Sequence, residues 1–368
     1  TARGTIEADH LARAGFEVVG LDPRDPPHSE GSHGGRTRII RKAYFEHPTY
    51  VPWVRRAYQL WAQLQEDADR ELFVRTGGLH VSTPEGRQKT DAQYAVQAHG
   101  LTADELDDQE LVDRFPGFAH REDLEAIYSP HSGFLWAREA IDAQLARARN
   151  HGATLSTGEG LQAWGSTAEG VRVQTARGTI EADHLVLAVG AWLPEIAPAL
   201  PVTFTVERQV QFRFPARRHA DRFTPETFPV FAFDGPDGQV FYGIPVPDRG
   251  VKIAAHHGGQ TTTADTVDRT VRDADEAKVR RFVRSILPDL DGAPAHAEVC
   301  LYTNTPDHHF LLDRHPAHED VVVASPCSGH GFKFAPAIGE GIKDLLVADE
   351  TRQPRYLFRM GRFGASRS

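Results

Sequence analysis

The chain has 368 residues, 40% of them hydrophobic, and a formal net charge of −10 at pH 7. This length allows a large buried core and predicts two domains. The acidic balance argues against a nucleic-acid partner, because phosphate backbones require a strongly basic face, and favours a metabolic enzyme.

Cysteine and hydropathy patterns indicate the compartment. Cys300 and Cys327 are the only cysteines, which is too few for a disulfide framework and is typical of a reducing compartment. No apolar run reaches the roughly 18 residues that span a bilayer, and no export signal opens the chain. We therefore expect a soluble cytoplasmic protein without a membrane partner.

The start of the chain is anomalous. Residues 1–11, TARGTIEADHL, are identical to residues 175–185. A dinucleotide-binding fold opens instead with a strand, a G-x-G-x-x-G turn and a helix, which together let the backbone approach a diphosphate. That motif is absent, and a fold-like pattern begins only near His10 with the end of a helix. We therefore expect a truncated or spliced start that lacks the first strand and the phosphate-binding turn, which puts cofactor retention in doubt.

The first strand signal follows directly. Residues 15–22, GFEVVGLD, form an apolar run that ends in Asp22. In a parallel dinucleotide-binding sheet, an acid at this place accepts a hydrogen bond from the adenosine ribose. An acid in an ordinary turn before Pro23 explains the pattern equally well.

The remaining elements alternate between helices and strands. A β-rich stretch from Gly170 to Val189 ends in Gly190, where small residues allow a cofactor to approach the backbone. Residues 206–252 alternate like antiparallel strands and indicate a separate sheet that covers the substrate. Apolar residues at helical spacing predict helices at 54–64, 138–150, 275–287 and 337–347, and turn residues predict turns at 235–238 and 247–250.

The most informative tract is residues 300–334. It begins with Cys300, contains an apolar strand-like run and ends in a glycine-flanked turn that bears Lys333 immediately before a helix. A helix start there would direct backbone N–H groups at an anion. This order of parts resembles the flavin-holding end of the monomeric sarcosine oxidase and N-methyltryptophan oxidase family, and the resemblance extends over about residues 12–368.

The resemblance implies an α/β fold, α+β overall. A two-dinucleotide-binding-type FAD domain would be joined to a second, mixed-sheet substrate domain. The FAD domain would comprise residues 1–78, 136–205 and 300–368, and the substrate domain residues 79–135 and 206–299. The family's active-site residues then map onto this chain one by one.

For the cofactor, the resemblance implies FAD bound covalently through Cys300, with Thr37 and Arg38 against the ring. The other cofactor contacts that it implies are Asp22, Leu161, Gly190, Gly329, His330, Gly331, Phe332 and Lys333. Gly34 departs from the family, which often has a histidine there. Without the resemblance, a lone cysteine is more often a small buried hydrophobe, and Cys327 is assigned to packing.

For the substrate, the resemblance implies that Arg41 and Lys333 hold a carboxylate, since a guanidinium suits bidentate carboxylate binding. Lys252 would promote reaction with oxygen, and Tyr242 would form a wall. His256 would be the active-site histidine, although His257 leaves that register open by one. Pocket size would depend on Tyr242 together with Phe231 and Phe233. Solvated surface cations and a structural histidine are the alternative interpretations of these residues.

The implied reaction is flavin-dependent oxidation of the C–N bond of a secondary amino acid, N-methyl or cyclic, to an imine, with O2 reduced to H2O2. The resemblance also implies a monomer. A dehydrogenase that uses another electron acceptor and an inactive truncated homologue are the alternatives. Metal binding is not expected, because the histidines at 308, 309, 315 and 318 lack ligands at zinc spacing.

Overall fold

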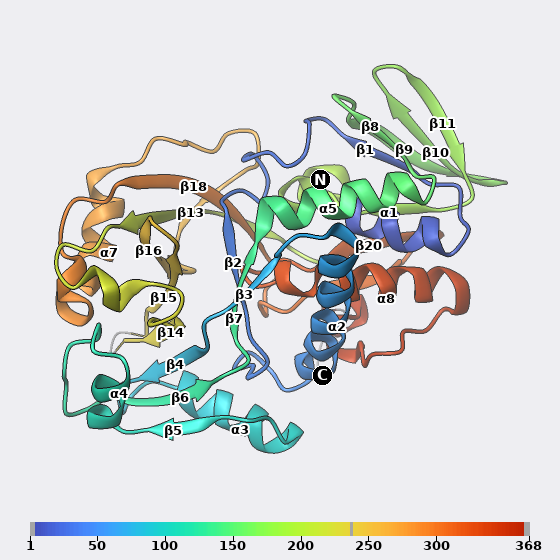
Figure 1. Cartoon of the computed structure of the whole chain (residues 1–368). Helices are drawn as coiled ribbons and strands as arrows, with labels where there is room; N and C mark the ends of the chain where they lie inside the picture. Colours follow the sequence, from blue (N-terminus) through green and yellow to red (C-terminus); the bar gives the residue numbers. More distant parts are fainter. Residues whose placement is uncertain (1–3, 236–237, 364–368) are drawn as a thin grey trace, which may run out of the picture.

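The computed structural model describes residues 4–235 and 238–363. Two lobes are visible in Figure 1, one rich in helices and one built on a large sheet. The helical lobe contains α1 (Gly4–Arg13), α2 (Tyr50–Ala68), α5 (Ala137–Asn150) and α8 (Ala335–Ala348). Among the described residues, no helix has the length and apolar character needed to cross a membrane.

Short parallel sheets form the centre of the helical lobe. β1 (Val19–Asp22) pairs in parallel with β8 (Thr154–Thr157). β12 (Leu185–Leu187) pairs in parallel with β20 (His318–Ser325), which also pairs antiparallel with β19 (Leu311–His315). Val321 to Ser325 of β20 are all buried, as expected for a strand covered on both faces.

An antiparallel sheet projects from the same lobe in Figure 1. It consists of β9 (Leu161–Thr167), β10 (Gly170–Thr175) and β11 (Gly178–Ala182). A further small sheet joins β2 (Thr37–Ile40), β7 (Gly133–Trp136) and β3 (Phe73–Arg75). β2 matters most for the site, because it carries Thr37 and Arg38.

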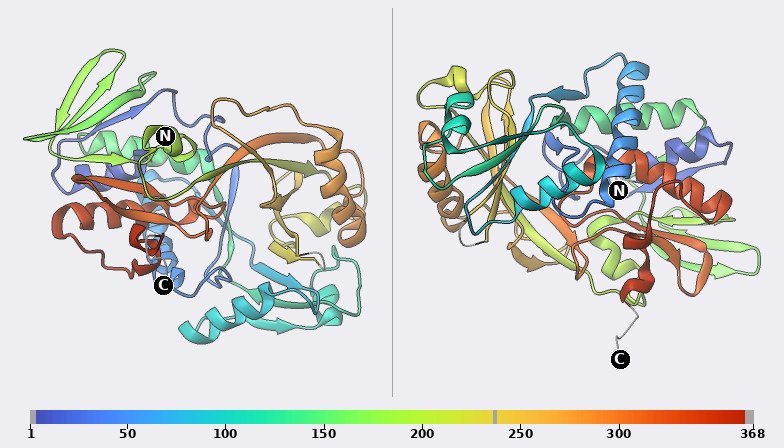
Figure 2. Two further views of the ribbon diagram at one scale, coloured as in Figure 1. Left: turned by 180° about the vertical axis from the view of Figure 1, so that it is seen from behind. Right: turned by 90° about the horizontal axis from the view of Figure 1, so that it is seen from below.

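The other lobe is built on a nine-stranded sheet. Its long strands β13 (Thr205–Phe214) and β18 (His296–Asn304) pair antiparallel and reach toward the helical lobe, as the view from behind in Figure 2 shows. The helices of this lobe are α3 (Gln88–His99), α4 (Asp108–Arg114) and α7 (Asp273–Ile286). The other strands of the sheet are β4 (Gly78–Ser82), β5 (Asp104–Leu106), β6 (Glu125–Ser129), β14 (Val230–Asp234), β15 (Val240–Val246), β16 (Gly250–His256) and β17 (Gln260–Thr262); the short helix α6 (Leu193–Ile196) follows β12.

Helix α2 connects the core of the helical lobe to the site. Its buried face includes Trp53 and Trp61, whose indole N–H groups donate to the carbonyl oxygens of Pro354 and Lys333. Helix α1 packs against α5 and α8. A buried ion pair between Arg147 and Asp9, with an N–O distance of 2.7 Å, fastens α1 to α5.

The α/β fold class is confirmed, as are the four predicted helices, which correspond to α2, α5, α7 and α8; only the third extends further than its helix, by Leu287. Strands occupy most of the stretches predicted at 170–189 and 206–252. The predicted turn at 235–238 includes residues 236–237, which lie outside the described residues, as do residues 1–3 of the repeat. The predicted domain boundaries remain a prediction.

The repeated sequence adopts two conformations. Residues 4–11 lie in helix α1, whereas the identical residues 178–185 form strand β11 and the start of β12. Tertiary context therefore decides the conformation of this sequence, because its intrinsic propensities are the same at both places.

Candidate active site

One cavity gathers most of the predicted site residues at the junction of the two lobes. It has about 880 Å³ of empty space, including its mouth. Strands β2, β13, β15, β16 and β18 and the turn before α8 supply its walls. Its lining includes Thr37, Arg38, Arg41, Tyr242, Lys252, His256, Cys300, Gly329, His330, Gly331, Phe332 and Lys333. We call it the central cavity.

A buried lysine lies next to strand β2 in this cavity. Lys252 of β16 is 7% exposed, and its ammonium donates to the carbonyl oxygen of Thr37 at 2.6 Å. Arg38 donates to the same carbonyl at 2.9 Å. Burial and then the neighbouring Arg38 charge lower the pKa of Lys252 to about 7. The site therefore holds a cation that titrates near neutral pH.

The predicted carboxylate ligand Arg41 is already paired. Its Nη2 donates to both carboxylate oxygens of Glu46, at 2.6 and 2.8 Å, and its Nη1 donates to the carbonyl oxygen of Ala43 at 3.0 Å. The rings of Tyr44 and Phe45 flank the guanidinium at 4.3 and 4.2 Å. Burial, the largest single effect, would raise the pKa of Glu46, but the neighbouring Arg41, His330 and Lys333 together outweigh it and hold that pKa well below its usual range.

The turn before α8 brings Lys333 to the cavity. Ser328 and Gly329 have φ angles of 45° and 76°, and a side chain at Gly331 would collide with the carbonyl of Pro326. The Lys333 ammonium donates to the carbonyl oxygen of His330 at 2.7 Å and to the hydroxyl of Tyr44 at 3.3 Å. Lys333 and Arg41 thus converge on the ring of Tyr44.

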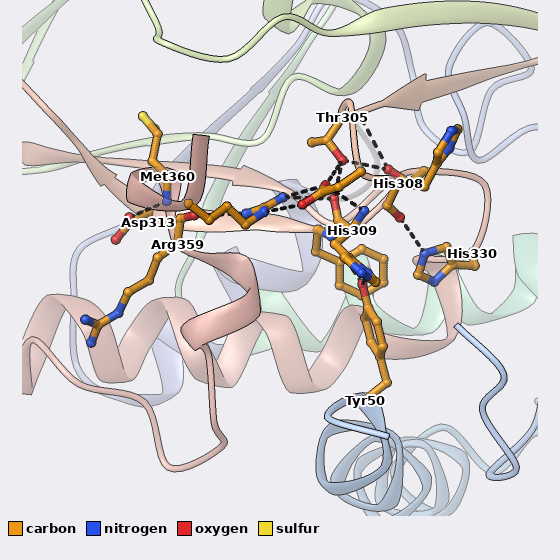
Figure 3. Close-up of polar contacts among 12 residues, drawn as sticks. Tyr50, Thr305, His308, His309, Asp313, His330, Arg359 and Met360 are labelled. Atoms are coloured by element: carbon orange, nitrogen blue, oxygen red, sulfur yellow. Dashed lines mark hydrogen bonds and ion pairs between the residues drawn. The ribbon is translucent and has the colours of Figure 1, made fainter. Parts of the chain in front are cut away.

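The turn at residues 305–309 fixes the position of His330, as Figure 3 shows. His330 Nε2 lies 3.1 Å from the carbonyl oxygen of His308, and its Nδ1 lies 2.7 Å from the Tyr44 hydroxyl. Tyr50 contacts His309 Nδ1 through its hydroxyl at 3.1 Å. Because both ring nitrogens of His330 are engaged and burial lowers its pKa to about 3, His330 is a neutral structural element of the wall.

Strand β18 contributes Cys300, which is 6% exposed and lines the cavity. Burial raises the pKa of its thiol. Tyr302 lies two residues further along the strand, and its hydroxyl is 3.2 Å from Nδ1 of His256. Of the two histidines that the sequence left open, His256 lines the cavity and His257 does not.

Three predicted cofactor contacts lie outside this lining. Asp22 ends β1, where one carboxylate oxygen accepts from the backbone N–H of Arg24 at 2.9 Å and lies 3.4 Å from His28 Nε2. Leu161 begins β9, and Gly190 follows β12. Their roles at the adenosine end of a cofactor remain predictions.

The predicted influence of Phe231 and Phe233 on pocket size is wrong. Both side chains are buried in the core of the large sheet, where they contact Phe282 of α7. Successive side chains of a strand point to opposite faces, so Ala232 of β14 lines the cavity instead. Cys327, assigned to packing, is 2% exposed and also lines the cavity.

Sequence reasoning missed Glu46, Ser32 and Gln211, which also line the cavity. Only Glu46 carried a signal, since an acid five residues after a predicted ligand arginine is a candidate partner. Ser32 Oγ, Gln211 Oε1 and Thr303 Oγ1 are buried without a hydrogen-bond partner among the described residues. Among the described residues, no group of three histidine, cysteine or acidic side chains could hold a metal ion.

These features fit the isoalloxazine half of FAD. The unpartnered oxygens of Ser32, Gln211 and Thr303 could hydrogen-bond the polar edge of the ring, and the cations Arg38 and Lys252 suit a ring that gains negative charge on reduction. Cys300 supplies a thiol within the same wall. Mixed sheets around such a cavity define a flavin-dependent oxidoreductase.

Comparison with known proteins agrees. The family model described as FAD dependent oxidoreductase matches residues 4–345. A monomeric sarcosine oxidase from Streptomyces avermitilis is 37% identical, with 99% of this chain and 96% of the relative covered. An N-methyl-L-tryptophan oxidase from Salmonella heidelberg is 32% identical, with 98% and 96% covered. The chain therefore belongs to the FAD-dependent oxidoreductase family, within its group of sarcosine and N-methyltryptophan oxidases.

Solved structures share the fold. NikD, an amino acid oxidase of nikkomycin biosynthesis, superposes with a TM-score of 0.84 at 22% identity. The match covers 97% of this chain and 94% of the NikD chain. An L-proline dehydrogenase from P. horikoshii superposes with a TM-score of 0.83 at 22% identity and covers 99% and 95%.

Proposed function

We propose that the chain oxidises the C–N bond of a small secondary amino acid to an imine, with FAD linked through Cys300 and O2 as the electron acceptor that yields H2O2. The observation that carries this proposal is the set of three cations, Arg41, Lys252 and Lys333, in the cavity that also contains Cys300. The two relatives named as oxidases of sarcosine and N-methyl-L-tryptophan support the substrate class.

The carboxylate of the substrate would be held by Arg41 and Lys333. Both side chains are buried; Cζ of Arg41 lies 4.3 Å and Nζ of Lys333 lies 5.3 Å from the centre of the Tyr44 ring. A guanidinium and an ammonium placed together bind one carboxylate strongly when water is excluded. This grip would orient the carbon next to the amine nitrogen toward the ring, and the walls formed by Phe45, Tyr242 and Ile244 would exclude water.

FAD, when bound, would accept the two electrons and the hydrogen removed from that carbon. Lys252 would supply a positive charge beside the ring at the stage when oxygen is reduced. His256 and Tyr302 would form a polar part of the cavity wall, and the hydrogen bond between them fixes the imidazole. Water would then hydrolyse the released imine to an amine and a carbonyl compound.

Peroxide production tests the proposal. Flavin-loaded protein should form one H2O2 per sarcosine consumed in air, as measured by a peroxidase-coupled assay. N-methyl-L-tryptophan and L-proline should be compared at equal concentration to find the preferred side chain. Absence of turnover with every secondary amino acid, in protein with a full flavin spectrum, would refute the assignment. Electron transfer to an artificial acceptor without peroxide would instead identify a dehydrogenase.

Covalent attachment has a separate test. Digested protein should contain the Cys300 peptide at a mass raised by one FAD, while the Cys327 peptide keeps its unmodified mass.

We also propose that the protein is a monomer in the cytoplasm, as the name of its sarcosine oxidase relatives and its two free cysteines suggest. Light scattering after size exclusion would measure the mass in solution.

A further inference from the structure

A second cavity adjoins the segment that carries Arg41, because Lys42 and Ala43 line it. It has about 510 Å³ of empty space, including its mouth, and shares no lining residue with the central cavity. Lys42 and Ala43 form one wall, Arg55 of α2 another, and Ser129 and His131 at the end of β6 a third. We call it the basic cavity.

Positive charge is concentrated around the basic cavity. Arg55 and Arg75 are the charges that act most on Lys42, and Lys42 and Arg75 are those that act on His131. No described carboxylate forms an ion pair with Lys42, Arg55 or Arg75. The ion pairs nearby use Arg41 and Arg56 instead. Burial and the two guanidinium groups lower the pKa of Lys42, as expected for a cation that lacks an anion.

A buried hydroxyl points to a ligand independently. Ser129 is 5% exposed and lines the basic cavity, yet its Oγ has no hydrogen-bond partner among the described residues. A buried hydroxyl without a partner is uncommon, because its desolvation is not compensated. The turn that follows is fixed, since the carbonyl oxygen of Ser132 accepts from the N–H groups of Thr76 and Gly77 at 3.3 and 3.0 Å.

Other contacts hold the cationic walls in place. The Lys42 ammonium lies 4.7 Å from the ring centre of Tyr58, whose hydroxyl donates to the carbonyl oxygen of His131 at 2.9 Å. Arg55 donates to the carbonyl oxygen of His99 at 2.6 Å. The two lining cations therefore come from different segments, Lys42 from the stretch after β2 and Arg55 from α2, and Tyr58 of α2 connects Lys42 to His131.

We propose that the basic cavity binds a small multivalent oxyanion of the phosphate class. Phosphate offers several acceptor oxygens, which suits a site with the Lys42 ammonium, the Arg55 guanidinium and the Ser129 hydroxyl in its walls. The site is separate from substrate chemistry but adjoins it, because Ala43 lines the basic cavity and its carbonyl oxygen accepts from Arg41. Binding would hold the segment that positions Arg41.

Isothermal titration with inorganic phosphate tests this proposal on the flavin-loaded full chain. Ionic strength is kept constant with sodium chloride, so that general screening does not contribute. Wild-type protein should show saturable binding at one site. Lys42→Gln should weaken binding by about tenfold or more, and Ser129→Ala by a smaller factor, because a charged hydrogen bond is worth more than a neutral one.

Lys278→Gln is the matched control, since it removes one positive charge from α7 in the other lobe. It should leave phosphate affinity unchanged. If Lys42→Gln does not fold, Arg55→Gln serves the same purpose. Absent saturation in the wild type, equal weakening by Lys278→Gln, or equally tight binding of acetate would each overturn the phosphate site.

Discussion

At the residue scale, the proposed oxygen step depends on Lys252, which is buried and forms no ion pair with a carboxylate of the described residues. Lys252 donates to the carbonyl oxygen of Thr37, and its pKa of about 7 lies far below the ordinary value of 10.5. A lysine with such a pKa loses its charge within the range in which enzymes work. Position and titration together make Lys252 the best candidate for the oxygen step.

Lys252→Met should slow the reaction with oxygen by about 100-fold, which is the typical effect of losing one preorganised charge. Anaerobic reduction by substrate should stay nearly unchanged, and stopped-flow spectroscopy measures the two half-reactions separately. In the wild type the ammonium is protonated below its pKa, so the oxygen rate should fall as pH rises through about 7. Lys252→Arg keeps the charge at all these pH values and should remove that fall.

Arg41→Ala should raise KM for the amino acid by about 10- to 100-fold, because it removes the two charge-assisted hydrogen bonds that we propose Arg41 makes to the substrate carboxylate. The effect on kcat should be smaller. Arg36→Ala is the control, since Arg36 belongs to the same segment but is exposed and contacts Trp136 outside the central cavity. Equal KM values for Arg41→Ala and wild type would exclude Arg41 from carboxylate binding.

At the element scale, strand β14 separates the substrate wall from the core. Ala232 faces the central cavity, whereas Phe231 faces α7 and lies opposite Gly243, which leaves room for its ring. The sequence predicted strands here but not which face was buried, because both faces of this strand carry apolar residues. The sequence therefore predicted the alternation of side chains along the strand, but not which of its two faces points to the cavity.

Ala232→Leu should therefore narrow the cavity and lower kcat/KM more for N-methyl-L-tryptophan than for sarcosine. Its thermal stability should change little. Phe231→Ala should do the reverse: it should cost about 3–5 kcal/mol of unfolding free energy while leaving the substrate preference intact. Steady-state kinetics on both substrates and urea denaturation distinguish the two variants. A shift in preference from Phe231→Ala would contradict the assigned faces.

At the scale of the whole molecule, retention of the cofactor is the sharpest question. The described residues place Arg38, Lys252 and Cys300 around the cavity that would hold the ring. We expect the bond through Cys300 to hold the flavin. Cys300→Ala should lose its flavin on gel filtration, whereas Cys327→Ala should keep it. The ratio of visible to ultraviolet absorbance after filtration gives the result.

The sequence and its family resemblance brought together residues that share a cavity in the structure, while their roles stay predictions. Cys300, Lys252 and Lys333 were predicted and share one cavity, although they are distant in the chain. The repeat at residues 1–11 shows the limit, because the same letters form a helix in α1 and a strand in β11. Neighbours in space decide such cases, and local patterns do not contain that information.

The salt bridge between Arg41 and Glu46 has a consequence for selectivity. If Arg41 holds the substrate carboxylate, as proposed, an incoming amino acid must displace Glu46, which already pairs with the guanidinium. An amine without a carboxylate cannot replace Glu46 in this way and leaves the Arg41–Glu46 pair intact. Under that proposal, the Arg41–Glu46 pair selects against amines that lack an acid group, before any contact with the reacting nitrogen.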